Sequence, residues 1–149
     1  MSKISKYLDK NMVVFLDVNT RDEAVSTLVN LAHEGGKIHD EAEFYNAIID
    51  RERIVSTGIG MAVAIPHAKL AAYDDFFIVI GILSHGVDWN TIDGSAVRII
   101  FMIGGPDDKQ TEYLQILSGI TSAVKKDDRR KQVINASSQE EVIELLKGF

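Results

Sequence analysis

Two short and nearly continuous apolar runs occupy the middle of the chain, at Phe76–Leu83 (FFIVIGIL) and Val97–Ile103 (VRIIFMI). Each run is bounded by Asp, Gly or Ser, and such runs are typical of strands that are buried on both faces. Ala62–Ile65 and Val13–Leu16 are shorter candidate strands. We therefore expect a sheet that is covered by helices on both sides.

The segments between the candidate strands Val13–Leu16 and Ala62–Ile65 show helical periodicity with recognisable ends. Thr20 begins a capping box, because a threonine oxygen can accept from the amide three residues later. Gly35-Gly36 supplies the left-handed residue that ends such a helix. Asp40 begins a second helix, which we expect to run to about Arg51.

Two more helices are predicted in the last third of the chain. Gly104-Gly105-Pro106 breaks the chain before a helical pattern over about Lys109–Lys125, and Ser138 begins another capping box and a terminal helix. The expected apolar stripe of the longer helix is Leu114, Leu117, Ile120 and Val124. This order of elements predicts one α/β layered domain spanning residues 1–149.

Composition and charge exclude several classes of function. The chain has 149 residues, no cysteine and a formal net charge of −6. The basic clusters Lys125–Lys126 and Arg129–Lys131 lie among aspartates and indicate a solvated helix junction, so nucleic acid is not an expected partner. No apolar run reaches the about 18 residues that span a membrane, so we expect a cytoplasmic protein without membrane insertion. Any nucleophile must be His, Ser, Thr, Lys or a carboxylate.

The least ordinary stretch is residues 51–67, RERIVSTGIGMAVAIPH. Pro66 biases the residue before it to extended backbone, so we expect His67 on a loop at the end of a strand. A neutral imidazole has an unperturbed pKa of about 6.5 and can attack phosphorus directly near pH 7. Arg51 is a candidate cation for the charge on the phosphoryl oxygens. No metal or other cofactor is expected in this scheme.

Four residues between Arg51 and His67 have the composition of a phosphate-binding loop. The two glycines let the backbone approach a ligand closely, and the two hydroxyls are donors. These residues are Ser56, Thr57, Gly58 and Gly60. As a pattern alone, Gly-x-Gly is weak evidence for a phosphate-binding loop, and a lone histidine is more often structural than catalytic.

Three motifs together resemble a known family. Arg51-Glu52, Ser56–Gly60 and Ala64–His67 are similar to the enzyme IIA signature of the fructose/mannitol type, within the phosphoenolpyruvate-dependent sugar phosphotransferase system. The similarity extends over most of the chain, including the tail Ser138–Leu146. It implies a single-domain mixed β-sheet with helices packed on both faces. The motif Ser-Thr-Gly-Ile-Gly and the length of the chain resemble the nitrogen-regulatory branch of the family most.

The resemblance also implies a role and partners. The family's histidine is phosphorylated by the phosphocarrier HPr, and its arginine contacts the phosphate, so we carry these roles over to His67 and Arg51. We expect HPr or its nitrogen-type paralogue as donor, and a separate enzyme IIB or a regulated target protein as acceptor. Sugar uptake, regulation through the phosphorylation state, and a binding homologue that is never phosphorylated remain alternatives. A hydrolase pairing His67 with Asp74 or Asp75 lacks an evident oxyanion arrangement.

The sequence departs from the family's pattern beside the expected site. Tyr113 stands where many members have a second active-site histidine, and its hydroxyl can either donate to a phosphate or point into the core. The first alternative makes Tyr113 a phosphate-binding residue. Met61 and Ala68 also replace the residues usual near the family's histidine, and Met61 is a candidate for an apolar docking rim.

The other conspicuous residues have structural interpretations. His33 and His39 lack the convergent ligands of a metal site and are interpreted as surface residues. His85 is expected in a loop between two strands, and Trp89 is expected to pack over the sheet edge. Arg53 competes as the phosphate clamp, and only the family match decides against it.

Overall fold

Six strands form one sheet in the computed structural model, which describes residues 3–149. Residues 1–2 of the predicted domain lie outside this description. The strands are β1 (Val13–Leu16), β2 (Gly58–Gly60), β3 (Val63–Ala64), β4 (His67–Lys69), β5 (Phe77–Val87) and β6 (Val97–Gly105). Their order is β1-β5-β6-β3-β2, with β4 as a further partner of β6.

The sheet contains both parallel and antiparallel pairs. β1 runs parallel to β5, whereas β5 and β6 are antiparallel, with Ile80 opposite Phe101. β3 and β4 both run parallel to β6, and β2 folds back antiparallel on β3. The sheet is therefore mixed, as the resemblance implied.

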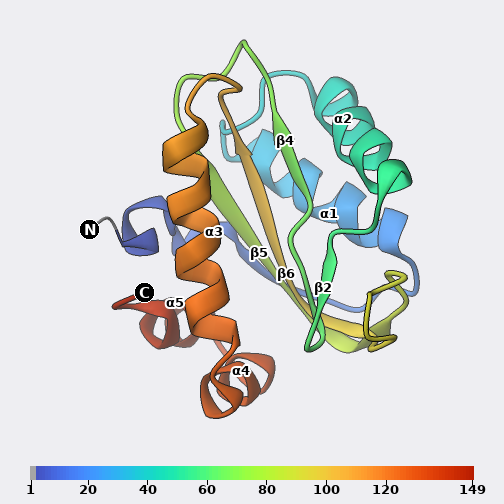
Figure 1. Cartoon of the computed structure of the whole chain (residues 1–149), viewed down its shortest axis with the longest axis vertical. Coiled ribbons are helices and arrows are strands. Elements are labelled where there is room, and N and C mark those ends of the chain that lie inside the picture. Colours follow the sequence, from blue (N-terminus) through green and yellow to red (C-terminus); the bar gives the residue numbers. More distant parts are fainter. Residues whose placement is uncertain (1–2) are drawn as a thin grey trace.

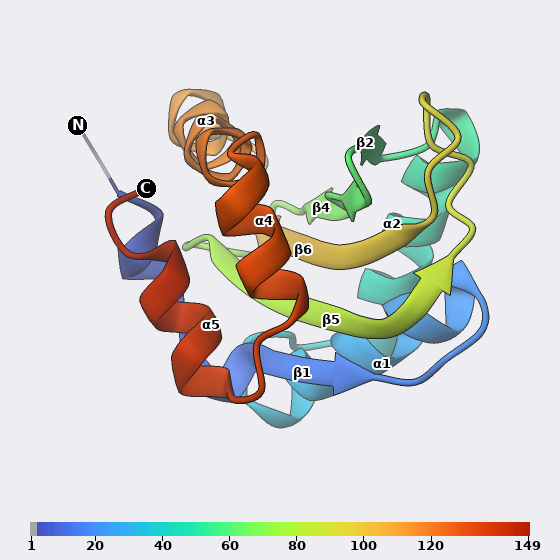
Figure 2. The same ribbon diagram turned by 90° about the horizontal axis from the view of Figure 1, so that it is seen from below.

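Five α-helices in residues 3–149 cover both faces of this sheet (Figures 1 and 2). They are α1 (Arg21–Glu34), α2 (Glu41–Ile54), α3 (Gln110–Val124), α4 (Asp127–Ile134) and α5 (Gln139–Leu146). Two short 3₁₀ helices, η1 (Ile4–Tyr7) and η2 (Lys10–Met12), precede β1. Helices α1 and α2 pack on one face, and α3, α4 and α5 pack on the other. The predicted fold class is confirmed.

The predicted helix starts are confirmed by their capping bonds. The side chains of Thr20, Asp40 and Ser138 each accept a hydrogen bond from the amide three residues later, at 3.1, 3.0 and 3.1 Å. Gly36, with φ +79°, is the left-handed residue that follows α1. Helix α2 continues three residues past Arg51, which therefore lies in its last turn.

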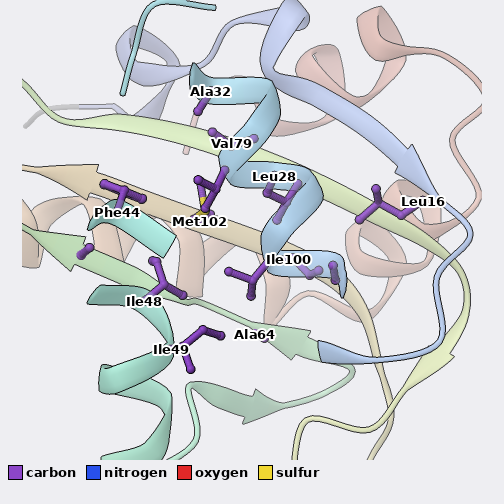
Figure 3. Close-up of a cluster of buried hydrophobic side chains, with 14 of the residues drawn as sticks. Leu16, Leu28, Ala32, Phe44, Ile48, Ile49, Ala64, Val79, Ile100 and Met102 are labelled. Carbon is purple, nitrogen blue, oxygen red and sulfur yellow. The ribbon is translucent and has the colours of Figure 1, made fainter. Parts of the chain in front are cut away.

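The core consists of one apolar layer on each face of the sheet. Successive residues of β5 and β6 alternate between the layers, so the stretches Phe77–Leu83 of β5 and Ile99–Ile103 of β6 carry no polar side chain. The layer under α1 and α2 includes Leu28, Phe44, Ile48, Val79, Ile100 and Met102 (Figure 3). The opposite layer includes Ile78, Ile80, Ile99, Phe101, Ile116 and Ile120.

The inward face of α3 differs from the predicted stripe. Leu114 is 53% exposed and Leu117 is only partly buried. The buried residues are Tyr113, Ile116, Ile120, Ala123 and Val124. These positions also follow helical spacing. They place the ring of Tyr113, and not the side chain of Leu114, against the sheet.

Two other segments differ from the expectation. His85 is exposed, but it lies within β5 and not in a loop, because the strand continues to Val87 after an irregularity in its pairing with β6. Helix α4 was not predicted, since only Val133 of its residues is buried and its apolar pattern is weak. Of the basic residues in this region, Lys125 and Lys126 lie at the junction of α3 and α4, as predicted, whereas Arg129–Lys131 lie within α4.

Candidate active site

His67 is the first residue of a strand, not of a loop as predicted. Proline has no N–H to donate, so the ladder along β6 is interrupted between β3 and β4. The two segments resume pairing on either side of the break, with Ala64 opposite Ile100 and His67 opposite Ile103. The amide of Ile103 donates to the carbonyl of Pro66 at 3.0 Å. The backbone of His67 is thereby fixed to the central strand of the sheet.

The imidazole of His67 is half-buried and has one nitrogen free. Its Nδ1 lies 3.1 Å from the carbonyl oxygen of Ile65. A carbonyl can only accept, so Nδ1 carries the proton and Nε2 has the lone pair. Burial lowers the pKa of His67, and the charges of Arg51 and Lys69 also lower it, against the Ile65 bond and Glu52. The ring is therefore neutral near pH 7.

Arg51, in the last turn of α2, acts electrostatically on His67, whereas Arg53 is exposed to solvent. The Nη1 group of Arg51 donates to the carbonyl of Val55 at 2.8 Å, which holds the half-buried side chain at the helix end. Its positive charge lowers the pKa of His67, and it partly offsets the rise that burial causes in the pKa of Tyr113. Arg53 is 72% exposed and pairs with Asp50 at 3.4 Å.

Tyr113, in the first turn of α3, places its ring beside His67. The two ring centroids are 5.5 Å apart, and the ring of Phe76 stacks on Tyr113 at 6.1 Å. The side chain is only 5% exposed. Its hydroxyl makes no hydrogen bond within residues 3–149. Every fully enclosed polar side-chain atom in these residues has a hydrogen-bond partner, so the hydroxyl of Tyr113 is not fully enclosed and contacts solvent. Burial raises the pKa of Tyr113, and the phenol remains protonated.

The hydroxyls of Ser56 and Thr57 donate within the protein. The Ser56 hydroxyl donates to the carbonyl of Trp89, and that of Thr57 donates to the buried carboxylate of Glu52. Neither proton is available to a phosphate in this conformation. Neither hydroxyl bonds to His67, so these contacts do not support the phosphate-binding role predicted for Ser56 and Thr57.

Gly58 and Gly60 serve the packing of the β2–β3 hairpin. Gly60 has φ +95°, and a Cβ there would lie 2.8 Å from the carboxylate of Asp93. A Cβ on Gly58 would collide with Thr91. Both glycines are thus required by contacts with the 91–95 loop, which explains them without a phosphate.

Glu52 holds Thr57 and Trp89 together. The sequence analysis named Glu52 as part of a motif but gave it no role of its own. The carboxylate is 4% exposed and accepts from the amide of Thr57 at 3.1 Å, from the Thr57 hydroxyl, and from Trp89 Nε1 at 3.1 Å. Trp89 is buried, as predicted. The available signal was that Glu52 continues the four-residue spacing of the inward Phe44 and Ile48, where an acidic residue needs partners.

Replacing Glu52 by alanine is expected to lower the free energy of unfolding by about 3 kcal/mol, because three buried donors lose their acceptor. Urea denaturation followed by the fluorescence of Trp89 measures this. Glu43→Ala is the matched control, since Glu43 is exposed on the same helix and its loss should cost less than about 1 kcal/mol. Equal effects of the two variants would contradict the buried network.

The remaining candidates lie outside the site. Ala68 is buried in the layer under α2, and Met61 lies in the β2–β3 turn with its sulfur 3.8 Å from Arg130 Nη1. Asp74 and Asp75 are exposed and are not among the charges that shift the pKa of His67. His33 and His39 are exposed, as predicted.

The family of the chain follows from comparison with known proteins. Residues 6–148 match the family model described as the phosphoenolpyruvate-dependent sugar phosphotransferase system, EIIA 2. The chain therefore belongs to this enzyme IIA family. It is 30% identical over 145 residues to the fructose-specific EIIABC component of Bacillus subtilis, covering 97% of this chain and 23% of that longer protein.

Solved structures have the same fold. The nitrogen regulatory protein IIA-Ntr from Neisseria meningitidis superposes with a TM-score of 0.89 at 25% identity, covering 97% of this chain and 99% of that one. The enzyme IIA of mannitol from Escherichia coli, determined in complex with phosphorylated enzyme IIB, gives a TM-score of 0.81 at 22% identity, covering 95% and 98%. Relatives of the chain thus include both sugar-specific and nitrogen-regulatory proteins.

No helix in residues 3–149 combines the length and apolar character needed to cross a bilayer. No three His, Asp or Glu side chains of the described residues gather in a way that could hold a metal ion.

Proposed function

We propose that the chain is a cytoplasmic phosphocarrier that accepts a phosphoryl group on Nε2 of His67 and passes it to another protein. The observation that carries the proposal is a neutral, half-exposed imidazole with its Nε2 lone pair free beside the guanidinium of Arg51. Membership of the enzyme IIA family supports HPr, or its nitrogen-type paralogue, as the donor.

The transfer step balances without a cofactor. The Nε2 lone pair of His67 forms a bond to phosphorus as the nitrogen–phosphorus bond of the donor's phosphohistidine breaks, and the donor imidazole keeps that electron pair. The carbonyl of Ile65 holds the proton on Nδ1 and stabilises the positive charge that the ring gains. Arg51 stabilises the charge on the equatorial oxygens, and the protonated hydroxyl of Tyr113 is a further donor.

Exposed apolar residues near these site residues in the sequence are available to bind the partner. Ile54 and Val55 follow Arg51 at the end of α2, Leu114 follows Tyr113 on α3, and Ile59 lies on β2. The complex of the E. coli mannitol protein with phosphorylated enzyme IIB supports a separate enzyme IIB as one acceptor. The likeness to IIA-Ntr supports a regulated target instead, which would sense the about two negative charges that phosphorylation adds.

A binding homologue that is never phosphorylated is the second candidate, motivated by Tyr113 in place of the family's second histidine. Two observations favour the phosphocarrier. The ring of Tyr113 lies beside that of His67, and its hydroxyl contacts solvent. Among residues 3–149, no carboxylate pairs with Arg51, so its charge is available to a phosphoryl group.

Labelling of the wild-type chain tests the proposal. Radiolabelled phosphoenolpyruvate with enzyme I and HPr is expected to give a label on the chain that is labile in acid and stable in alkali. Nitrogen-15 NMR of the product should place the phosphorus on Nε2 and the proton on Nδ1 of the ring. Absence of label, with both HPr and its nitrogen-type paralogue as donor, would overturn the phosphocarrier and leave the binding homologue.

A further inference from the structure

Lys69 lies beside the site in a position that the proposed function does not yet use. It is two residues after His67 on β4, so the two side chains leave the same face of the strand, while Ala68 is buried on the other face. Lys69 Nζ lies 4.1 Å from the centroid of the Tyr113 ring, and it donates to Oε1 of Gln110 at 2.9 Å. Lys69 and His67 therefore contact the same aromatic ring.

The positive charge of Lys69 has only neutral partners. Within the described part of the chain, no carboxylate lies within ion-pair distance of Lys69 or Arg51, although the chain has 22 acidic residues against 16 basic ones. Other basic side chains, among them Arg21, Arg130 and Lys147, do have carboxylate partners. Two unpaired cations beside one imidazole repel each other until an anion binds between them.

We propose that Lys69 is the second phosphoryl-binding cation of the site, and that its ammonium moves from the face of Tyr113 to the oxygens of the phosphoryl group on His67. This inference rests on the proposed function. Arg51 approaches from the end of α2 and Lys69 approaches along β4, so the two charges bind the phosphoryl group from different sides. Tyr113, at the position of the family's second histidine, holds the lysine through its ring and leaves the second positive charge to Lys69.

The movement exchanges contacts with neutral groups for a contact with a charged one. The ammonium leaves an aromatic ring and a neutral amide oxygen and pairs with a negatively charged phosphoryl oxygen. The lysine has a flexible stem and three donors, so it can leave Gln110 without a change of backbone. In the unphosphorylated protein, Lys69 thus stays on the ring of Tyr113, close enough to His67 to bind the phosphoryl group after transfer.

Rates of phosphoryl acceptance from phospho-HPr test this assignment. Lys69→Met removes the charge and keeps the length of the stem, and it is expected to slow acceptance by about 10- to 100-fold, the effect of one charge-assisted hydrogen bond. Lys69→Arg should recover most of the rate. The matched control is Lys109→Met, a lysine bonded to the carbonyl of Asp74 nearby, which should change the rate less than about twofold.

Titration of the phosphoryl group by phosphorus-31 NMR gives a readout that a structural role would not move. A cation on the oxygens favours the dianion, so the phosphoryl pKa should be higher in Lys69→Met than in wild type and close to wild type in Lys69→Arg. Lys69→Gln provides a second neutral variant if the methionine protein folds poorly.

The outcomes separate this inference from the proposed function. Wild-type labelling with unchanged rates and phosphoryl pKa in Lys69→Met would overturn the role of Lys69 and leave the phosphocarrier intact. Equal slowing by Lys69→Met and Lys109→Met would also overturn it, because diffuse attraction of the donor would then explain both. A wild-type chain that takes no label would overturn both proposals.

Discussion

Replacing His67 by alanine is expected to abolish phosphoryl acceptance completely. Nε2 of His67 is the only atom in the proposed step that forms a bond to phosphorus, so no neighbouring group can substitute for it. The nearby hydroxyl of Tyr113 remains protonated because burial raises its pKa, and it is therefore a poor nucleophile. The measurement is the acid-labile label that the variant retains after prolonged incubation with enzyme I, HPr and labelled phosphoenolpyruvate.

His85→Ala is the matched control for this loss. His85 is also a strand histidine, but it is exposed on β5 and its ring faces Asp17 at 3.4 Å. The control should be labelled at the wild-type rate. Near-UV circular dichroism checks that His67→Ala keeps its fold, since only the Nδ1 bond to Ile65 is lost from the backbone around it. Acid-labile label on a folded His67→Ala protein would refute the assignment of the nucleophile.

The local features of the fold were predictable from local sequence. Capping by Thr20, Asp40 and Ser138 depends on residues three positions apart, and the apolar runs of β5 and β6 report burial on both faces directly. The rotation of α3 was not predictable in the same way. Two apolar stripes share that helix, and only contact with the sheet selects the one that contains Tyr113 and leaves Leu114 exposed.

The candidate site was predictable where the family resemblance names a position, as it does for Arg51, His67 and Tyr113. Arg51 and His67 were found from the sequence because the motif of the resembled family contains both. The bond from Trp89 to Glu52 spans 37 positions, and the bond from Lys69 to Gln110 spans 41. No periodic pattern connects residues so far apart, so these contacts required the fold. The strand position of His67 also depended on a neighbour, since β4 exists only through its pairing with β6.

Replacing Arg51 by methionine is expected to reduce the rate of phosphoryl acceptance by about 100-fold. Removing one donor that stabilises developing charge in a transition state typically costs this much, and the guanidinium is held in advance by its bond to Val55. Arg51→Lys should recover only part of the rate, because an ammonium keeps the charge but loses the planar fork that matches two phosphoryl oxygens.

Arg53→Met separates this effect from a general loss of positive charge at the end of α2. Arg53 is two residues away, carries the same charge and is paired with Asp50 at the surface, so its loss should change the rate by less than about twofold. Stopped-flow or quenched-flow labelling over a range of HPr concentrations distinguishes a slower transfer step from weaker binding. If the two arginine variants slowed transfer equally, the guanidinium beside His67 would have no special role, and the charge stabilisation at this site would have to come from Lys69 and Tyr113.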